Sequence, residues 1–108
     1  KIKLHGKGLA KRSFIHIDDF INAFSLILRK AKHLEIYNIG TEEKIRINKL
    51  ALLISKLMNK KIFIKRKKIA KGSTRMRCPD ITKIKKIGFV KRISLKKGLE
   101  NIINNPDY

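Results

Sequence analysis

The order of hydrophobic and polar positions along the chain predicts a small α/β unit with about three short strands and four helices. Strands are predicted where apolar, often β-branched residues cluster or alternate, over residues 13–17, 35–39 and 62–64. Helices are predicted where apolar residues recur every three or four positions, over residues 20–31, 48–58, 80–87 and 94–103. Three short strands make only a small sheet, so we expect such a unit to pack against a larger one.

The first predicted helix has one apolar face, and we expect that face to pack against a sheet or another helix. It is formed by Phe20, Ile21, Phe24, Ile27, Leu28 and Ala31. Asp18 and Asp19 precede this face, where acidic side chains cap free N–H groups and complement the positive end of the helix dipole. Asp18 is therefore predicted to be a helix cap, and the nearby His16 a structural histidine.

The charge of the chain suggests a possible function. The sequence contains 28 Lys and Arg residues but only 8 Asp and Glu residues, for a net charge of +20 over 108 residues. Such a chain attracts phosphate polyanions. The densest basic stretch covers residues 60–68, and Lys60–Lys71 would be the binding surface. An independent basic module that binds nucleic acid is therefore an alternative interpretation. The composition argues against it, since Lys outnumbers Arg by 21 to 7, Trp is absent and aromatic residues are only 6%.

Several kinds of chemistry are missing from the sequence. The single cysteine, Cys78, excludes an intrachain disulfide and a multi-cysteine zinc site, and without a nearby histidine it is predicted to be an inert thiol. The sequence has no glycine-rich phosphate loop and no Tyr-x-x-x-Lys pair. We therefore predict no catalytic, cofactor-binding or metal-ligating residue in it.

The ends and the hydropathy of the chain give two further expectations. The sequence contains no run of about 18 apolar residues and no secretory pattern, so a cytoplasmic protein without a membrane span is expected. Because the chain starts at Lys1 without a methionine, we expect it to be a fragment.

Three arginines are the candidate functional residues, because a planar guanidinium can form paired hydrogen bonds where lysine supplies only charge. Arg12 lies at the mouth of the first predicted strand, and Arg75 and Arg77 lie in a distant loop that leads into a helix. This placement predicts that they converge on one diphosphate, each bidentate contact contributing roughly 1.5–3 kcal/mol. Solvated or ion-paired arginines are the alternative.

Read together, several segments resemble a known family. Residues 6–20, Gly-Lys-Gly-Leu-Ala-Lys-Arg-Ser-Phe-Ile-His-Ile-Asp-Asp-Phe, are similar to the Gly-x-Gly…Arg-x-Phe-(His/Tyr)-Val-x-Asp segment of extended short-chain dehydrogenases, the NAD-dependent nucleotide-sugar epimerases and dehydratases. Residues 35–40 resemble their Tyr-Asn-(Ile/Val)-Gly strand, and residues 47–54, 77–89 and 94–100 resemble the helices that follow it. The resemblance covers nearly the whole chain in the right order.

The resemblance implies that residues 1–108 are the C-terminal, nucleotide-sugar-binding portion of a longer enzyme and lack its Rossmann half. In the family that half carries the Gly-x-x-Gly-x-x-Gly loop and the Tyr-x-x-x-Lys set, so this chain alone is expected to be inactive. By position, Arg12 matches the family's strand-mouth arginine, and Arg75 or Arg77 matches the second arginine at the diphosphate. The lysine-rich residues 65–71 depart from the family pattern.

The resemblance also implies the cofactor and the partners of the intact enzyme. NAD would take a hydride from the sugar, typically at C4, and the keto intermediate then leads to an epimer or, after water loss, to a dehydrated product. NAD is not expected to bind this fragment alone. The implied partners are a nucleotide-sugar substrate, the Rossmann half and a second copy of the intact enzyme, with no nucleic acid and no membrane. A truncated gene product without activity is the remaining alternative.

Overall fold

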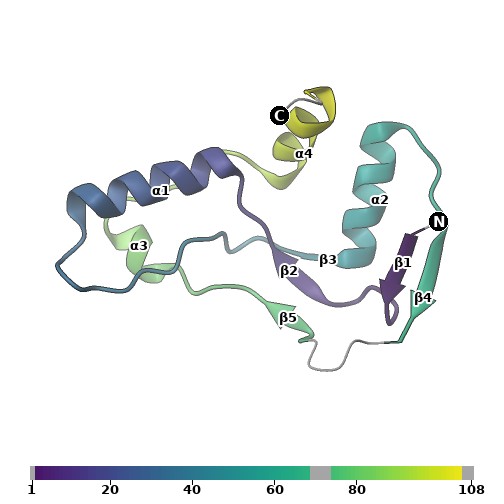
Figure 1. Ribbon diagram of the computed structural model, residues 1–108, viewed down its shortest axis with the longest axis horizontal. Coiled ribbons are helices and arrows are strands. Elements are labelled where there is room, and N and C mark those ends of the chain that lie inside the picture. Colours follow the sequence, from purple (N-terminus) through teal and green to yellow (C-terminus); the bar gives the residue numbers. More distant parts are fainter. Residues whose placement is uncertain (1, 69–73, 106–108) are drawn as a thin grey trace.

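The chain folds into short strands, which form two small sheets, and helices (Figure 1). The structure is a computed structural model that describes residues 2–68 and 74–105. Within these residues the elements, in chain order, are β1 (Ile2–His5), β2 (Lys11–Ser13), α1 (Ile17–Lys30), β3 (Lys44–Arg46), α2 (Ile47–Met58), β4 (Ile64–Lys67), β5 (Met76–Arg77), α3 (Thr82–Lys86) and α4 (Leu95–Asn104). The α/β class and the four helices predicted from the sequence are confirmed, whereas the described strands number five rather than about three.

The two sheets differ in their pairing. One contains β1 and β4 in parallel, with Ile2 opposite Ile64. The other has the order β3-β2-β5, and its central strand β2 runs antiparallel to β3 and parallel to β5. Parallel neighbours require a crossover, and residues 14–75 supply it between β2 and β5. The central position of β2 places Arg12 between Ile45 and Arg77.

The predicted strands fall in somewhat different places. The strand expected over residues 13–17 ends at Ser13, because His16 already caps α1. The strand expected over residues 62–64 is displaced to β4. Residues 35–39 form no strand within the described chain, since no neighbouring segment pairs with them. The predicted loop over residues 65–79 contains most of β4 and all of β5, while residues 69–73 lie outside the described residues.

The N-cap of helix α1 is a histidine rather than an aspartate. His16 has extended backbone angles, and its Nδ1 accepts a hydrogen bond from the Asp18 amide at 3.1 Å. The prediction that Asp18 caps the helix is therefore wrong: Asp18 and Asp19 both lie in the first turn. Asp19 is completely buried, and its carboxylate accepts hydrogen bonds from the backbone amides of Arg92 and Ile93.

The hydrophobic core lies between α1 and the segment around α3 (Figure 1). Ala23 and Leu26 of α1 contact the buried side chains of Ile81, Ile84 and Phe89. This corrects the expected packing of α1, because most of the predicted apolar face is exposed: Phe20, Ile21, Phe24 and Leu28. The helix is turned so that small Ala23 and neighbouring Leu26, rather than the bulkiest residues, meet the core.

The molecule is elongated and thin for its length. Its principal extents are 48 × 34 × 19 Å and its radius of gyration is 16.3 Å, whereas a compact domain of this size has a radius of gyration of about 13 Å. Figure 1 shows α1 and α3 at one end, and β1, β4 and α2 at the other. Among the described residues, no helix is both long enough and apolar enough to cross a lipid bilayer.

Candidate functional site

A pocket of about 300 Å³ opens where β2, the end of the 35–40 segment and the chain after β5 meet. Three stretches that are distant in the sequence form its walls: Arg12, Ser13, Ile15, Ile39, Gly40, Arg77, Cys78 and Pro79. Two of the three arginines predicted from the sequence therefore line one pocket.

Sheet register brings Arg12 and Arg77 together. The two residues are Cα partners in the parallel pair of β2 and β5, and partners in neighbouring strands project their side chains from the same face of the sheet. Arg12 donates from Nη1 to the Lys11 carbonyl and from Nη2 to the Thr74 carbonyl, both at 2.8 Å. Arg77 donates from Nε to the Thr74 hydroxyl at 3.0 Å. Thr74 thus orients both guanidinium groups.

Arg75 has a different position. Its backbone carbonyl accepts a hydrogen bond from the Lys11 amide at 2.6 Å, which holds the start of β5 against β2. Its side chain is exposed, and Arg75 is not among the residues that line the pocket. The structure therefore brings Arg12 and Arg77 together at the pocket and leaves Arg75 beside it.

The two pocket arginines have no carboxylate partner among the described residues. The ion pairs there are His16–Asp18, Lys83–Glu35, Lys85–Glu42 and Lys91–Glu43. Two guanidinium groups that approach each other repel, by about 1 kcal/mol at a separation of about 4 Å in a water-like dielectric. An anion with several acceptor oxygens removes this repulsion and can accept from both forks at once. The pocket supplies charge and hydrogen-bond donors, and none of its lining residues forms a general acid–base pair.

Close packing of Gly40 against Pro79 shapes the wall of this pocket. A Cβ atom at Gly40 would lie 2.5 Å from Pro79 Cγ, closer than real Cβ contacts occur. Only glycine therefore allows the two segments to meet there. Gly40 directly follows the strand predicted over residues 35–39, and a glycine directly after an apolar run is a signal of close backbone approach.

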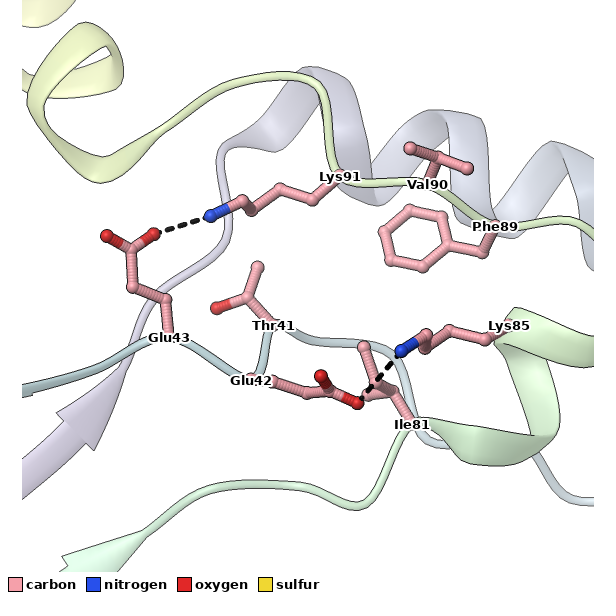
Figure 2. A pocket seen from close by; sticks show the side chains of 8 residues that line it. All are labelled: Thr41, Glu42, Glu43, Ile81, Lys85, Phe89, Val90 and Lys91. Atoms are coloured by element: carbon pink, nitrogen blue, oxygen red, sulfur yellow. Dashed lines mark hydrogen bonds and ion pairs between the residues drawn. The ribbon is translucent and has the colours of Figure 1, made fainter.

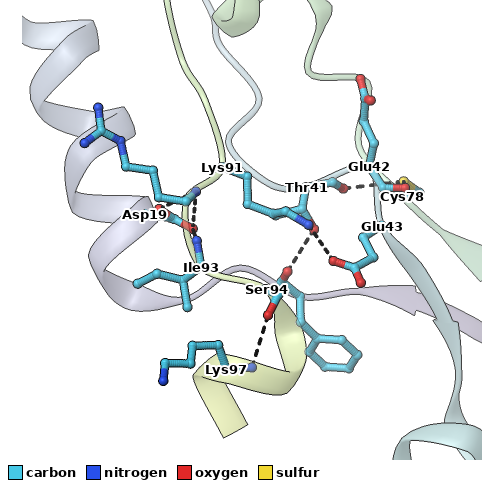
Figure 3. A network of polar contacts seen from close by, with 11 residues as sticks. Asp19, Thr41, Glu42, Glu43, Cys78, Lys91, Ile93, Ser94 and Lys97 are labelled. Carbon is cyan, nitrogen blue, oxygen red and sulfur yellow. Dashed lines mark hydrogen bonds and ion pairs between the residues drawn. The ribbon is translucent and has the colours of Figure 1, made fainter. Parts of the chain in front are cut away.

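Buried polar contacts hold the loops around the pocket in place (Figure 3). Thr41 is 2% exposed, and its hydroxyl donates to the Phe14 carbonyl at 2.8 Å. The Cys78 thiol donates to the Thr41 carbonyl at 3.6 Å, so it is tied to the backbone as a structural group. Asp19 joins α1 to the segment before α4. No motif in the sequence pointed to Thr41 or to the contacts of Asp19.

A second pocket, of about 260 Å³, lies between the 41–43 segment and the chain around α3 (Figure 2). Its charged residues are already matched, with Lys85 Nζ 3.3 Å from Glu42 and Lys91 Nζ 2.5 Å from Glu43. The remaining walls include Ile81, Phe89 and Val90. A phosphate group would face two carboxylates here, so the pocket of Arg12 and Arg77 is the better candidate for an anion.

Two carboxyl groups that contact α3 have lowered pKa values. The hydrogen bond from Lys83, together with the charge of that lysine, lowers the pKa of Glu35. Hydrogen bonds from the Thr82 hydroxyl (2.6 Å) and amide (3.0 Å) lower the pKa of Asp80. Neither group lines the arginine pocket, so these shifts concern the stability of α3 rather than ligand binding.

Comparison with known proteins adds three kinds of similarity. The model of a family described as the NAD dependent epimerase/dehydratase family matches residues 1–40. The trifunctional UDP-glucose 4,6-dehydratase/UDP-4-keto-6-deoxy-D-glucose 3,5-epimerase/UDP-4-keto-L-rhamnose-reductase of Arabidopsis thaliana is 30% identical over 113 residues, covering 99% of this chain and 17% of that protein. The human dTDP-D-glucose 4,6-dehydratase is 43% identical over 51 residues, covering 47% of this chain and 15% of that protein.

A solved structure extends the similarity to the whole fold. The UDP-glucose 4-epimerase of Thermotoga maritima, determined with UDP-glucose, superposes with a TM-score of 0.91 at 27% identity, covering 99% of this chain and 35% of that chain. The fold is therefore that of a part of the extended short-chain dehydrogenase/reductase enzymes. The family model and these relatives confirm the resemblance of the motifs to the NAD-dependent epimerase/dehydratase family. The chain spans less than a fifth of these curated relatives and about a third of the solved epimerase.

Proposed function

We propose that this chain is the C-terminal, substrate-binding portion of an NAD-dependent nucleotide-sugar epimerase or dehydratase. Its role there is to hold the diphosphate of the nucleotide-sugar between Arg12 and Arg77. The observation that carries the proposal is the register of β2 and β5, which puts these two arginines side by side at one pocket without a carboxylate partner among the described residues.

Diphosphate is the chemistry that best suits this arrangement. Each guanidinium has five N–H donors in a fixed plane, and Thr74 engages only some of them. A diphosphate carries two adjacent anionic groups, so each fork can meet one phosphate. Held in this way, the nucleotide-sugar is fixed at a point remote from its reacting carbon, and such remote binding energy orients a substrate for reaction.

NAD is proposed as the cofactor of the intact enzyme, in line with the family that the chain matches. The residues of this chain do not fit that cofactor, since the sequence contains neither a dinucleotide-binding glycine loop nor a Tyr-x-x-x-Lys set. The cofactor and the hydride chemistry are therefore assigned to the remaining part of the enzyme, as is any assembly into a homodimer. This chain contributes binding and orientation only.

The test compares three arginines in one protein. The chain is titrated calorimetrically with UDP and dTDP, and with uridine and thymidine, which lack the diphosphate. Arg12→Gln and Arg77→Gln are each expected to weaken nucleotide binding about 10- to 100-fold, the effect of losing one charge-assisted contact. Arg75→Gln is the matched control, because Arg75 lies in the same loop but outside the pocket lining, and it is expected to change affinity less than threefold.

The nucleosides separate diphosphate binding from recognition of the base. Their affinity is expected to be much lower than that of the diphosphates and unaffected by any of the three substitutions. Equal losses from all three substitutions would show that only net charge matters. Unchanged affinity in Arg12→Gln and Arg77→Gln would remove the diphosphate site altogether.

A further inference from the structure

A third pocket, of about 210 Å³, lies between α1 and the segment that joins α3 to α4. It is here called the Arg29–Arg92 pocket and is defined by the residues that line it: Asn22, Ser25, Leu26, Arg29, Gly88, Phe89, Val90 and Arg92. It shares no lining residue with the pocket of Arg12 and Arg77. Two of the seven arginines of a lysine-rich chain therefore meet at a second place.

Helix α1 contributes one wall, because three of its polar residues recur at helical spacing. Asn22, Ser25 and Arg29 are separated by three and four residues, which places them on one side of the helix. Arg29 donates from Nε to the Ser25 carbonyl of the preceding turn at 3.4 Å. Its Nη groups remain as donors, and the Asn22 amide and the Ser25 hydroxyl add neutral hydrogen-bonding groups.

A helix C-terminus shapes the opposite wall. Gly88 follows α3 with a φ of +108°, a backbone conformation in which a side chain would be strained. Its amide donates to the Lys85 carbonyl at 3.0 Å, and the Phe89 amide donates to the Ile84 carbonyl at 3.2 Å. This pair of bonds is typical of a helix that ends at a glycine. The segment that leads to Arg92 therefore leaves α3 in a defined direction.

The buried carboxylate of Asp19 fixes the two arginines relative to each other. It accepts hydrogen bonds from the amides of Arg92 and Ile93, at 3.2 and 3.0 Å. Asp19 belongs to the first turn of α1, the helix that also carries Arg29. The backbone of Arg92 is thus attached directly to the helix on the other side of the pocket, so both walls are positioned before any ligand arrives.

The charges in this pocket are not matched by the chain. Neither Arg29 nor Arg92 takes part in an ion pair within residues 2–68 and 74–105, and none of the lining residues is acidic. The lysines of the 260 Å³ pocket, in contrast, are both paired with glutamates. Two guanidinium forks without a carboxylate suit a dianion with several acceptor oxygens, which both forks can contact at once.

The volume of the pocket limits the ligand further. About 210 Å³ is less than the roughly 300–1,000 Å³ of pockets that enclose drug-sized ligands, so a small group fits and a whole nucleotide-sugar does not. We propose that the Arg29–Arg92 pocket binds a phosphate group, either the free ion or the phosphate of a monoester. The bound phosphate joins α1 to the segment between α3 and α4. This site goes beyond the proposed function and does not depend on it.

The test is a titration of the chain with inorganic phosphate, followed by amide NMR at about 0.15 M salt. The amides of Ser25, Gly88 and Val90 report this pocket, whereas those of Gly40 and Cys78 report the diphosphate pocket. The first three are expected to shift saturably, with a Kd of about 1 mM or lower, as two charge-assisted contacts would give.

Matched variants separate the two forks from net charge. Arg29→Gln and Arg92→Gln are each expected to weaken phosphate binding at Gly88 at least about tenfold. Lys30→Gln is the control, because Lys30 is the neighbour of Arg29 in α1 but does not line the pocket; it should change the affinity less than about threefold. All three side chains are exposed, so the fold should persist, and the amide spectrum reports it.

A second ligand distinguishes the two sources of phosphate. Glycerol 3-phosphate is titrated in the same way as inorganic phosphate. Equal affinity for the two supports a pocket for the phosphate of a larger molecule, because the ester group then extends out of the pocket. Binding of glycerol 3-phosphate that is at least about tenfold weaker supports a pocket for the free ion.

Three results would overturn the proposal. The first is a shift at Gly88 that grows linearly with phosphate and does not saturate. The second is an equal loss of affinity in Arg29→Gln and Lys30→Gln, since only net charge would then matter. The third is a set of shifts confined to Gly40 and Cys78, which would place phosphate in the diphosphate pocket alone. Absent UDP binding together with saturable shifts at Gly88 would leave this site standing and refute only the proposed function.

Discussion

The buried carboxylate of Asp19 is predicted to be a major structural contact of this chain. Asp19 is completely buried, and it accepts hydrogen bonds from the Arg92 amide at 3.2 Å and from the Ile93 amide at 3.0 Å. Replacing it with alanine leaves the amides of Arg92 and Ile93 without this acceptor in a part-buried site. Because the side chain is charged, each lost bond costs roughly 1.5–3 kcal/mol, so Asp19→Ala should lower the free energy of unfolding by about 3 kcal/mol or more.

Urea unfolding followed by circular dichroism measures this loss. With a urea m value of about 1–2 kcal/mol/M, the midpoint should fall by about 1.5–3 M. Asp18→Ala is the matched control, since the Asp18 carboxylate is 62% exposed and lies 3.8 Å from His16 Nδ1. It should change the free energy of unfolding by less than about 1 kcal/mol. If both variants unfold at the same urea concentration, the contacts of Asp19 do not stabilise the fold.

Three further outcomes are expected. Gly40→Ala should destabilise the chain by about 1–3 kcal/mol and weaken UDP binding, because its Cβ would lie 2.5 Å from Pro79 Cγ; Pro79→Ala in the same chain should recover part of both losses. The pKa values of Glu35 and Asp80 lie below their ordinary values of 4.5 and 3.8, so the unfolded chain binds more protons and the free energy of unfolding should fall as the pH drops below about 4.5. Duplex DNA should not bind at about 0.15 M salt, because the lysines form a solvated surface.

Each of these three outcomes has its own check. For Gly40, a double-mutant cycle with no coupling to Pro79 would contradict the steric argument. For the carboxyl groups, Glu35→Gln should reduce the acid sensitivity in urea titrations between pH 3 and 7, and an unchanged profile would assign the sensitivity elsewhere. For DNA, binding with a log–log salt slope of about −0.9 per phosphate would support the nucleic-acid interpretation instead.

The helices could be predicted from the sequence because their signals are local. Spacings of three and four residues locate all four. The last predicted helix begins at residue 94, and Ser94 is the N-cap of α4, where its hydroxyl accepts from the Lys97 amide at 3.2 Å. The face that α1 buries was predicted incorrectly. Periodicity shows that a helix has an apolar side. Which side of the helix packs against the core depends on the other elements of the fold, and the spacing of apolar residues within one helix does not describe these.

The strands could be predicted less well, because a strand exists only with its partner. Residues 35–39 have a strand-like pattern, yet they form no ladder within the described chain. Conversely, β5 has only two residues and no apolar alternation, so no local sequence pattern predicts this strand. The candidate arginines were found by residue type, whereas the choice of Arg77 rather than Arg75 for the pocket depends on a register between segments more than 60 residues apart.

The pairing of β5 with β2 is better explained by the placement of charge than by stability. Both residues of β5 are exposed, so the pairing buries little apolar surface, and it brings two positive side chains onto adjacent strands. Nevertheless, Arg12 and Lys11 each form a hydrogen bond to the chain just before β5, which fixes it against β2. Local arrangements that lower stability persist where the surrounding structure maintains them for a function. A diphosphate between Arg12 and Arg77 would attract both guanidinium groups and so offset their repulsion. The bound ligand would thereby stabilise the pairing of β5 with β2.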